Sequence, residues 1–328
     1  RTTINWEEIM KRYVLLSVAL GLAVSLGAAP AFAKDDEENL SKLGSFKRTD
    51  TGPMERVPQG GKYAANLRKV LQKIKMPDGF KIELFAIVPD ARHMAISRNK
   101  ATVWVGTRKT TVWSVTDRDM DNVADTVEEF SPSVNFDIPN GVCYTPDGFL
   151  YVVERNRVLL FPAAEYFMEG SDTVAIAIVK QGQLIPPDEE SYNHTARICA
   201  IGPDNKLYIS LGQPFNVTPQ EKVALYKKWG IGGMIRMDRD GKNRVVIAPG
   251  IRNSVGFDWH PVTGELWFTS NGRDRLGDEV PGDTLNHAPE IGMHFGYPFC
   301  HQGDIPDPEF GAQRGCGEFT PPAQTPGP

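Results

Sequence analysis

The sequence predicts an all-β fold built from repeated units, because one pattern occurs four times along the chain. In each copy an apolar strand is followed by a turn rich in Pro, Asp, Asn and Gly and then by a second apolar strand. An aromatic residue stands near the start of each second strand, and these residues are Trp104, Tyr151, Tyr208 and Trp267. Their period of about 50 to 60 residues is typical of the blades of a β-propeller. In such a fold, residues that precede the repeated strands lie near a common axis.

The length of the repeat region sets the expected number of blades. The four copies fill about 200 residues, and the region from Phe80 to Pro298 has room for about four to five blades at this period. Beyond Cys300 the sequence is typical of loops, and the final segment PPAQTPGP offers no closing strand. We therefore expect residues 76–328 to form a propeller domain that is incomplete at its C-terminal end.

The N-terminal segment has the features of an export signal. Lys11 and Arg12 precede an apolar run over residues 13–27, and Ala31-Phe32-Ala33 is a site that a signal peptidase accepts. A membrane anchor is the alternative, but about 15 apolar residues fall short of the ~20 that span a bilayer. We expect residues 1–33 to be removed after Ala33, which places the protein in the periplasm or outside the cell and leaves no membrane span.

Residues 34–75 are expected to form a polar lead-in that ends in one short helix. The stretch from 34 to 61 is charged and polar, whereas Leu67, Val70, Leu71 and Ile74 recur at helical spacing. A second short helix is expected over residues 221–229, between two repeats. From Phe80 onward the remaining pattern is strand and turn.

Composition excludes one large class of function. The 328 residues carry a formal net charge of −5, with 41% hydrophobic and 23% charged residues, as in an ordinary globular protein. Lys and Arg are scattered rather than gathered in a stripe, so the basic surface of a nucleic-acid-binding protein is missing. We expect no nucleic-acid partner.

The four cysteines differ in their expected state. Export into an oxidising compartment allows thiols to pair. Cys300 and Cys316 stand in one loop-rich stretch, and we expect a disulfide between them. Cys143 and Cys199 occupy matching places in two successive apolar strands, and we expect them to remain reduced as small buried residues.

The segment from Asp117 to Glu128 has the spacing of a calcium-binding loop. The candidate ligands are Asp117, Asp119, Asp121, the carbonyl of Val123, Asp125 and Glu128, at positions one, three, five, seven, nine and twelve. Asn122 replaces the usual Gly at position six, and Asn tolerates the left-handed backbone conformation. An acidic surface turn is the alternative. We expect a structural rather than a catalytic ion.

His194 is the candidate catalytic base. It lies three residues before Arg197, which begins the third repeat, so a propeller would place it facing the axis. Imidazole titrates near neutral pH and can remove a proton from an alcohol. A turn histidine that is hydrogen-bonded to a hydroxyl is the alternative.

Two further polar motifs flank the fourth repeat. Arg252 and Asn253 directly precede its first strand, and a guanidinium beside an amide suits a polyanionic ligand. A salt bridge between blades is the alternative. Asn271 to Asp274 follow its second strand as a turn whose carbonyls can face a metal, and Asp278, Glu279 and Asp283 come next. A charged, solvated loop is the alternative for this second motif.

Six blocks from about Phe80 onward, taken in order, resemble the glucose/sorbosone dehydrogenase family. These are soluble quinoproteins built on six-bladed propellers that use pyrroloquinoline quinone (PQQ). The blocks are GFKIELFA, VWVGTR, PNGVCYTPDGFLYVVERNR, the element from His194 to Arg197 with GPDNKLYISLG, GIRNSVGFDWHPVTGELWFTSNGRD, and HFGYPFCHQGDIPDPEFG. The last two blocks most resemble the sorbosone dehydrogenase-like branch.

The resemblance implies a role for each of these motifs. His194 matches the family's base, which takes the proton of the substrate hydroxyl while hydride passes to the quinone. Arg252 and Asn253, together with Arg197, match the positions that bind the cofactor. The backbone carbonyls of Gly272 and Arg273 match the turn that holds Ca²⁺ against the quinone. Gln213 and Asn216, after the third repeat, are further candidates for lining residues.

The resulting expectation is a periplasmic dehydrogenase with PQQ and Ca²⁺ as cofactors. It would oxidise a hydroxyl group of a sugar, aldose or polyol and pass the electrons to a respiratory acceptor. One alternative is a propeller lactonase whose axial Ca²⁺ activates water, for which Asn140 and Asn253 supply only part of the ligands. The other is a non-catalytic secreted propeller that binds protein partners, in which His194 and Arg252 would be unrelated in space.

Overall fold

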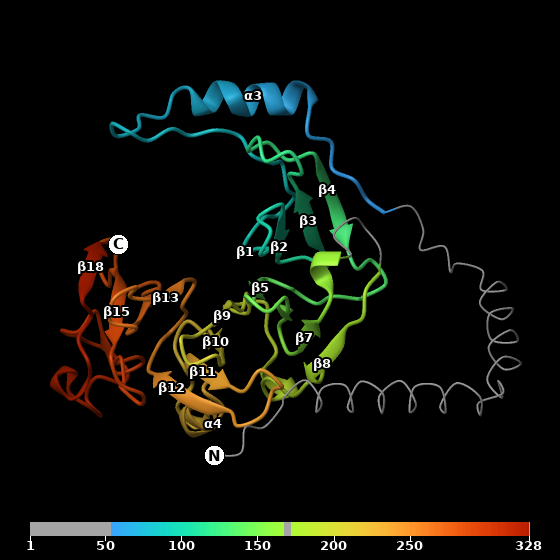
Figure 1. The fold of residues 1–328 in the computed structure, drawn as a ribbon. Coiled ribbons are helices and arrows are strands. Elements are labelled where there is room, and N and C mark those ends of the chain that lie inside the picture. The colour runs from blue at the N-terminus through green and yellow to red at the C-terminus, as the bar shows by residue number, and fades with distance from the viewer. Residues whose placement is uncertain (1–53, 167–171, 328) are drawn as a thin grey trace, which may run out of the picture. The chain divides into compact units, whose positions relative to one another are not determined.

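Four antiparallel sheets of four strands follow one another along the chain in the computed structural model (Figure 1). The structure describes residues 54–166 and 172–327, all within a compact unit that runs from Gly52 to Pro328. The signal peptide expected over residues 1–33 lies outside the described residues. Within them, no helix is long and apolar enough to cross a membrane.

In each sheet the strands are hydrogen-bonded in their order along the chain, as in the blades of a propeller. The first sheet consists of β1 (Met94–Ile96), β2 (Thr102–Val105), β3 (Val112–Thr116) and β4 (Thr126–Phe130). The second consists of β5 (Gly141–Tyr144), β6 (Leu150–Val153), β7 (Val158–Phe161) and β8 (Ile176–Val179). The third consists of β9 (Cys199–Ile201), β10 (Leu207–Leu211), β11 (Gly233–Met237) and β12 (Val245–Pro249). The fourth consists of β13 (Phe257–Trp259), β14 (Leu266–Ser270), β15 (Asp283–Ala288) and β18 (Gln324–Gly327).

The remaining elements are short. The two described α-helices are α3 (Gly61–Leu71) and α4 (Val223–Trp229), so both helices expected from the sequence are present. The second was expected between two repeats, but α4 lies between β10 and β11 within the third sheet. A small two-stranded sheet is formed by β16 (Cys300–His301) and β17 (Ile305–Pro306). Single 3₁₀ turns occur at η1 (Ala164–Tyr166), η2 (Pro187–Glu189), η3 (Gln220–Lys222) and η4 (Cys316–Glu318).

The repeated turn closes the hairpin between the first two strands of every sheet. At the equivalent place in each hairpin one residue adopts a positive φ, and these residues are Lys100, Gly148, Asn205 and Gly264, with φ of 63°, 98°, 59° and 71°. Gly and Asn reach this left-handed conformation at little cost, which explains the Gly and Asn of the sequence pattern. The turn chemistry therefore fixes the hairpins that the repeat predicts.

Neighbouring sheets pack face to face through apolar side chains. Because side chains alternate along a strand, Leu150 and Val152 of β6 face the first sheet, while Tyr151 and Val153 face the third. The same alternation places Tyr208 of β10 against the fourth sheet. Strands buried on both faces need apolar residues at successive positions, which is why these strands read as continuous apolar runs.

The first strands of the sheets lie innermost. β5 contacts both β1 and β9, and residues of all four first strands line one open cavity of 620 Å³ along the axis. The first sheet also packs against Val57 of the lead-in and against Ala86 and Val88, which follow it, so part of the segment expected to be a polar lead-in packs on the core. Four sheets match the lower end of the expected blade count.

The C-terminal segment differs from the expectation. Instead of a loop, residues 324–327 form β18, which pairs with β15 as the last strand of the fourth sheet. Pro326 is tolerated there because an edge strand needs ladder hydrogen bonds on one side only. The sequence did not predict this strand because the composition of PPAQTPGP is typical of turns.

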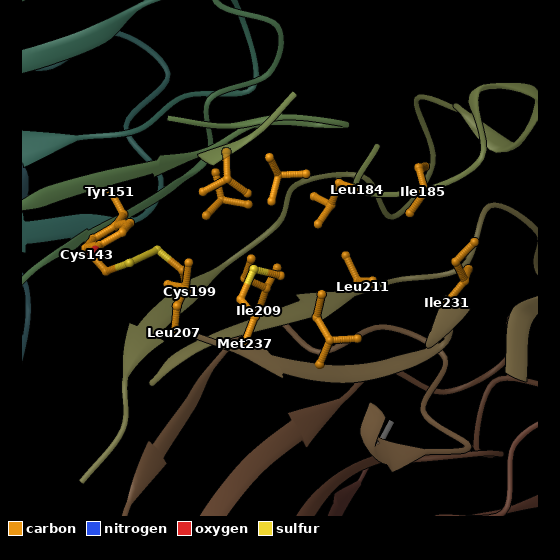
Figure 2. Packing of buried hydrophobic residues seen from close by; sticks show 14 of the residues in the cluster. Cys143, Tyr151, Leu184, Ile185, Cys199, Leu207, Ile209, Leu211, Ile231 and Met237 are labelled. Carbon is orange, nitrogen blue, oxygen red and sulfur yellow. A yellow bond between two sulfur atoms is a disulfide. The ribbon is translucent and has the colours of Figure 1, made fainter. Parts of the chain in front are cut away.

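The expectation that Cys143 and Cys199 remain reduced is wrong. They form a disulfide with their Cα atoms 5.8 Å apart, and Figure 2 shows this bond within the apolar cluster between the second and third sheets. Matching places in successive repeats lie on the adjacent inner strands β5 and β9, so the two side chains meet. The expected disulfide between Cys300 and Cys316 is confirmed, with a Cα separation of 5.3 Å.

We predict that the double variant Cys143→Ala/Cys199→Ala lowers the free energy of unfolding by about 4 kcal/mol, because the bond closes a long loop in the unfolded chain. The matched variant Cys300→Ala/Cys316→Ala closes a shorter loop and should cost about 3 kcal/mol. Denaturant midpoints measure both changes. Thiol titration of the oxidised, unfolded wild-type protein should find no free cysteine, and two free thiols per chain would contradict the first bond.

Candidate functional site

A cavity of 430 Å³ lies where the inner strands of the four sheets begin, and we call it the axial cavity. Most of its lining comes from the segments that directly precede β1, β5, β9 and β13, and Arg108, between β2 and β3, completes it. The polar residues among them are Arg92, His93, Arg108, Asn140, His194, Thr195 and Asn253. The repeat thus brings together side chains that are far apart in the sequence.

His194 has a fixed orientation in the wall of this cavity. Its ring nitrogen Nδ1 lies 2.7 Å from the carbonyl oxygen of Gln213, so Nδ1 carries the proton and Nε2 remains an acceptor. Burial lowers the pKa of His194 below 6.5, the positive charges of Arg252 and Arg197 add to this effect, and the Gln213 carbonyl opposes it. The imidazole is therefore neutral at pH 7 and has a free lone pair.

Gly212 allows the close approach of His194 and Asn253. A Cβ atom at this position would lie 2.3 Å from the side-chain oxygen of Asn253 and 2.5 Å from the carbonyl oxygen of His194. Both distances are far below van der Waals contact, so any side chain there would push the two segments apart. The glycine that follows β10 is therefore a requirement of the site.

Arg197 supports His194 from behind rather than facing the axial cavity. Its side chain is buried, with an exposure of 2%, and its Nη1 donates to the carbonyls of His194 and Gly212, both at 3.0 Å. Its Nε donates to the carbonyl of Arg155 at 3.3 Å. Burial lowers the pKa of Arg197 to about 10. The guanidinium that the resemblance assigns to the cofactor is thus committed to backbone carbonyls.

Asn253 begins a chain of hydrogen bonds that leads to the turn after β14. Its Nδ2 donates to Oδ1 of Asn271 at 3.0 Å, and Nδ2 of Asn271 donates to Oδ2 of Asp283 at 3.0 Å. The other oxygen of Asp283 accepts the backbone N–H of Gly272 at 2.9 Å. The expected metal turn is therefore held by one carboxylate and coupled to the axial cavity.

Gly272 and Arg273 line a second, smaller cavity of 30 Å³, together with Arg252 and His301. The structure thus separates the predicted residues into two adjacent groups, with His194 and Asn253 in the axial cavity and Arg252, Gly272 and Arg273 around the smaller one. The bond from Asn253 to Asn271 connects the groups.

Arg252 forms an ion pair within the fourth repeat. Its Nη2 lies 2.5 Å from Oδ2 of Asp274, and it also donates to the backbone and side-chain oxygens of Asn216 at 3.1 and 2.9 Å. The salt bridge that the sequence left open as an alternative is present, although it joins two segments of one blade rather than two blades. Asn216, expected only as a lining residue, orients this guanidinium.

Arg273 is held by a segment that the sequence analysis did not assign to the site. It forms ion pairs with Asp307 and Glu309, and Nε2 of His301 lies 2.7 Å from Oδ2 of Asp307. Burial raises the pKa of Asp307, but the hydrogen bonds from Arg273 and His301 outweigh it and lower the pKa. The only available signal was the block HFGYPFCHQGDIPDPEFG, which matched the family without indicating a role.

His93 is a second histidine in the axial cavity that sequence reasoning missed. Its Nδ1 accepts the backbone N–H of Val142 at 3.2 Å, and burial lowers its pKa. Its place directly before β1 matches that of Asn140 before β5, so the position within the repeat was the signal that could have found it.

The acidic loop is only partly as expected. Carboxylate oxygens of Asp117, Asp119 and Asp125 lie within 4.8 Å of one another. Glu128 is not among them, because it lies on β4 and its Oε1 is 2.6 Å from Nε of Arg56. Asp121 also stands outside this group and accepts the backbone N–H of Val123 at 2.7 Å. The group therefore lacks the ligands expected at positions five and twelve.

The chain is similar to known proteins in both sequence and fold. Residues 173–323 match the family model described as glucose/sorbosone dehydrogenase. The match covers a little under half of the chain and shows that this part is similar to that family. The matched stretch contains β8, the whole third sheet and β13 to β15 of the fourth, and with them His194, Arg252 and Gly272.

The sequence is also similar to a protein of Borreliella burgdorferi that is described as uncharacterised. The two are 27% identical over 237 residues. The alignment covers 70% of this chain and 58% of the relative, so the chain spans about three fifths of that protein.

The fold is similar to solved structures of sugar-oxidising enzymes. The calcium structure of a family AA12 carbohydrate-active enzyme from Trichoderma reesei has a TM-score of 0.57 at 20% identity, covering 72% of this chain and 63% of that one. The holo form of the PQQ domain of pyranose dehydrogenase from Coprinopsis cinerea has a TM-score of 0.56 at 15% identity, covering 70% and 59%. At these identities the likeness establishes the propeller fold alone.

We predict that Arg197→Met lowers the free energy of unfolding by about 2 to 3 kcal/mol, because it leaves buried backbone carbonyls without donors. Arg236→Met is the matched control, since Arg236 pairs with Asp204 at the surface and such pairs contribute about 0 to 1 kcal/mol. Urea unfolding measures both variants. Equal losses in the two would contradict the supporting role of Arg197.

Proposed function

We propose that the protein is a PQQ-dependent oxidoreductase that removes hydride from a hydroxyl-bearing carbon of a sugar, aldose or polyol. The observation that carries the proposal is the neutral, oriented imidazole of His194 in a cavity shared with Asn253. The glucose/sorbosone dehydrogenase match over residues 173–323 supports the class of reaction. The PQQ domain of pyranose dehydrogenase, with its similar fold, supports the cofactor.

The residues of the axial cavity fit an anionic cofactor. Arg92 and Arg108 supply positive charge, and Asn140 and Asn253 supply amides, which suit the carboxylates and carbonyls of a quinone such as PQQ. The hydroxyl of Thr195 is buried and has no hydrogen-bond partner, so a bound ligand can satisfy it. A volume of 430 Å³ is in the range of small-molecule sites. When bound, PQQ supplies the hydride acceptor.

His194 acts as the general base in this proposal. Its Nε2 takes the proton of the substrate hydroxyl as hydride leaves the same carbon, while the Gln213 carbonyl bonded to Nδ1 stabilises the imidazolium that forms. Arg197 holds the backbone of His194 in the position that this transfer requires. Asn253, which approaches His194 beside Gly212, helps to orient the reacting groups in this proposal.

Ca²⁺ is proposed at the turn of Gly272 and Arg273. The fit rests on Asp283, whose two oxygens fix Asn271 and Gly272, and on the adjacent 30 Å³ cavity, which is large enough for a single ion or water molecule. A cation bound by these backbone carbonyls would polarise a carbonyl oxygen. Arg273 is held away from the turn backbone by Asp307 and Glu309.

Export to the periplasm and electron transfer to a respiratory acceptor remain part of the proposal. They rest on the signal-like segment of residues 1–33. A Ca²⁺-dependent lactonase is less well supported, because the residues that line the axial cavity include no Asp or Glu to bind an axial metal or activate water. The non-catalytic alternative would leave His194 and Arg252 unrelated in space. They line separate cavities, but both contact Gln213, whose carbonyl pairs with Nδ1 of His194 and whose N–H donates to the carbonyl of Arg252, and this opposes the alternative.

The test is reconstitution of the protein with PQQ and Ca²⁺, followed by dye reduction with a panel of aldoses and polyols. His194→Gln should lower turnover by about 10²- to 10⁴-fold and leave PQQ binding intact, because it removes the base and keeps the volume. His260→Gln, at an exposed hairpin, is the matched control and should keep full activity. Lactone hydrolysis without dye reduction, or unchanged turnover of His194→Gln, would contradict the proposal.

The pH dependence of kcat/KM follows from the lowered pKa of His194. Since burial lowers the pKa of His194 below 6.5, its base form predominates at pH 7 and is lost only as pH falls through that lowered value. We predict a plateau of kcat/KM at neutral pH and an acidic limb with a midpoint below pH 6.5. A limb centred above pH 7 would assign the base to another group.

A further inference from the structure

We propose that the turn between β3 and β4 binds a divalent cation of the calcium type, through the carboxylates of Asp117, Asp119 and Asp125. This site is separate from the turn at Gly272 and does not rest on the proposed function. Carboxylate oxygens of the three residues lie within 4.8 Å of one another, so one ion can contact all of them.

The hairpin places two of these residues by its register. Thr116 at the end of β3 pairs with Thr126 at the start of β4, so Asp117 and Asp125 face each other at the next position. Asp119 reaches the same point from within the turn. Asn122, at the position where calcium loops usually carry Gly, has a φ of 69°, the left-handed conformation that the loop requires there.

The second observation concerns the burial of Asp117. Its side chain is only 7% exposed, and its Oδ1 has no hydrogen-bond partner. The other oxygen accepts the backbone N–H of Asn122 at 3.1 Å. Burying a carboxylate oxygen without a hydrogen-bond partner costs free energy. Repulsion from the two neighbouring carboxylates adds a second cost. A bound cation removes both penalties.

The chemistry of the site favours Ca²⁺ over Mg²⁺ and transition metals. All three ligands are carboxylates, and no His or Cys belongs to the cluster, which disfavours Zn²⁺. Three carboxylates in a flexible turn, completed by water, suit the six to eight oxygen ligands of Ca²⁺ better than the strict octahedron of Mg²⁺. Asp121 accepts the N–H of Val123 and Oε1 of Glu128 pairs with Arg56, and neither residue belongs to the cluster.

The turn also contacts the lead-in. Ala124 donates its N–H to the carbonyl of Phe85 at 2.8 Å, and the residues around Asp121 share a cavity with Arg68 and Leu71 of α3. An ion that orders residues 117–125 therefore also stabilises the packing of the lead-in against the first sheet. The inferred role is structural, at a distance along the chain from every residue assigned to catalysis.

The experiment titrates the chelator-treated full chain, without PQQ, with Ca²⁺ by calorimetry and with Tb³⁺ by luminescence. Asp125→Asn should weaken the binding of both ions at least tenfold. Asp125 is exposed, and asparagine can still accept the N–H of Arg118, so the variant should fold. Asp117→Asn should have a similar or larger effect. Mg²⁺ should bind at least tenfold more weakly than Ca²⁺.

Two controls separate this site from others. Asp240→Asn removes a carboxylate from an exposed turn of the third sheet and should change nothing. Asp283→Asn alters the Gly272 turn and should leave the Asp125-dependent binding intact, whatever becomes of the proposed activity. Ca²⁺ binding unchanged in Asp125→Asn, no Ca²⁺ binding at millimolar concentration, or equal affinity for Mg²⁺ would each overturn the proposal.

Discussion

The packing of neighbouring sheets through apolar faces is the interaction on which the rest of the structure depends. The second and third sheets each bury both faces, so their strands must be apolar at successive positions. Their polar residues therefore lie at the strand ends. The ends of the inner strands meet around the axis, and the axial cavity collects the polar residues found there. The candidate site therefore depends on the core. His194, Asn253 and His93 belong to different blades, and the apolar packing between the sheets brings them together.

The electrostatics of the site follow from the same burial. His194 and His93 are kept neutral because the surrounding protein disfavours their charged forms, and each has one nitrogen paired with a backbone group. Arg197 remains charged although fully buried, since three carbonyl oxygens replace the water it has lost. Arg197 and the Gln213 carbonyl hold His194 in one orientation, so the neutral imidazole needs no movement before a ligand binds.

The sequence was sufficient to predict the fold and part of the candidate site, but not the pairings of its residues. The aromatic and turn residues of the repeat predicted the hairpins. Position relative to each strand predicted that His194, Arg252 and Gly272 converge, and the structure places His194 in the axial cavity and the other two around the smaller one. The sequence could not predict the partners of Arg197, Arg252 and Arg273. These partners are backbone carbonyls or carboxylates from other segments, and their positions depend on tertiary packing. The bond between Cys143 and Cys199 was missed for the opposite reason: their matching places in adjacent repeats pointed to contact, and the apolar surroundings were given more weight. β18 was missed because local composition disfavoured a strand that its edge position permits.

The disulfide between Cys143 and Cys199 also determines where the molecule can come apart. It joins the inner strands of the second and third sheets across the cluster that packs them together. In the oxidised protein these two sheets cannot separate at the axis, so partial opening is directed to the interfaces on either side, with the first sheet and with the fourth. The covalently joined pair contains Asn140 and His194, whereas Asn253 and the Gly272 turn lie beyond one of those interfaces. On that side, the interface with the fourth sheet lies between His194 and the turn proposed to hold the metal.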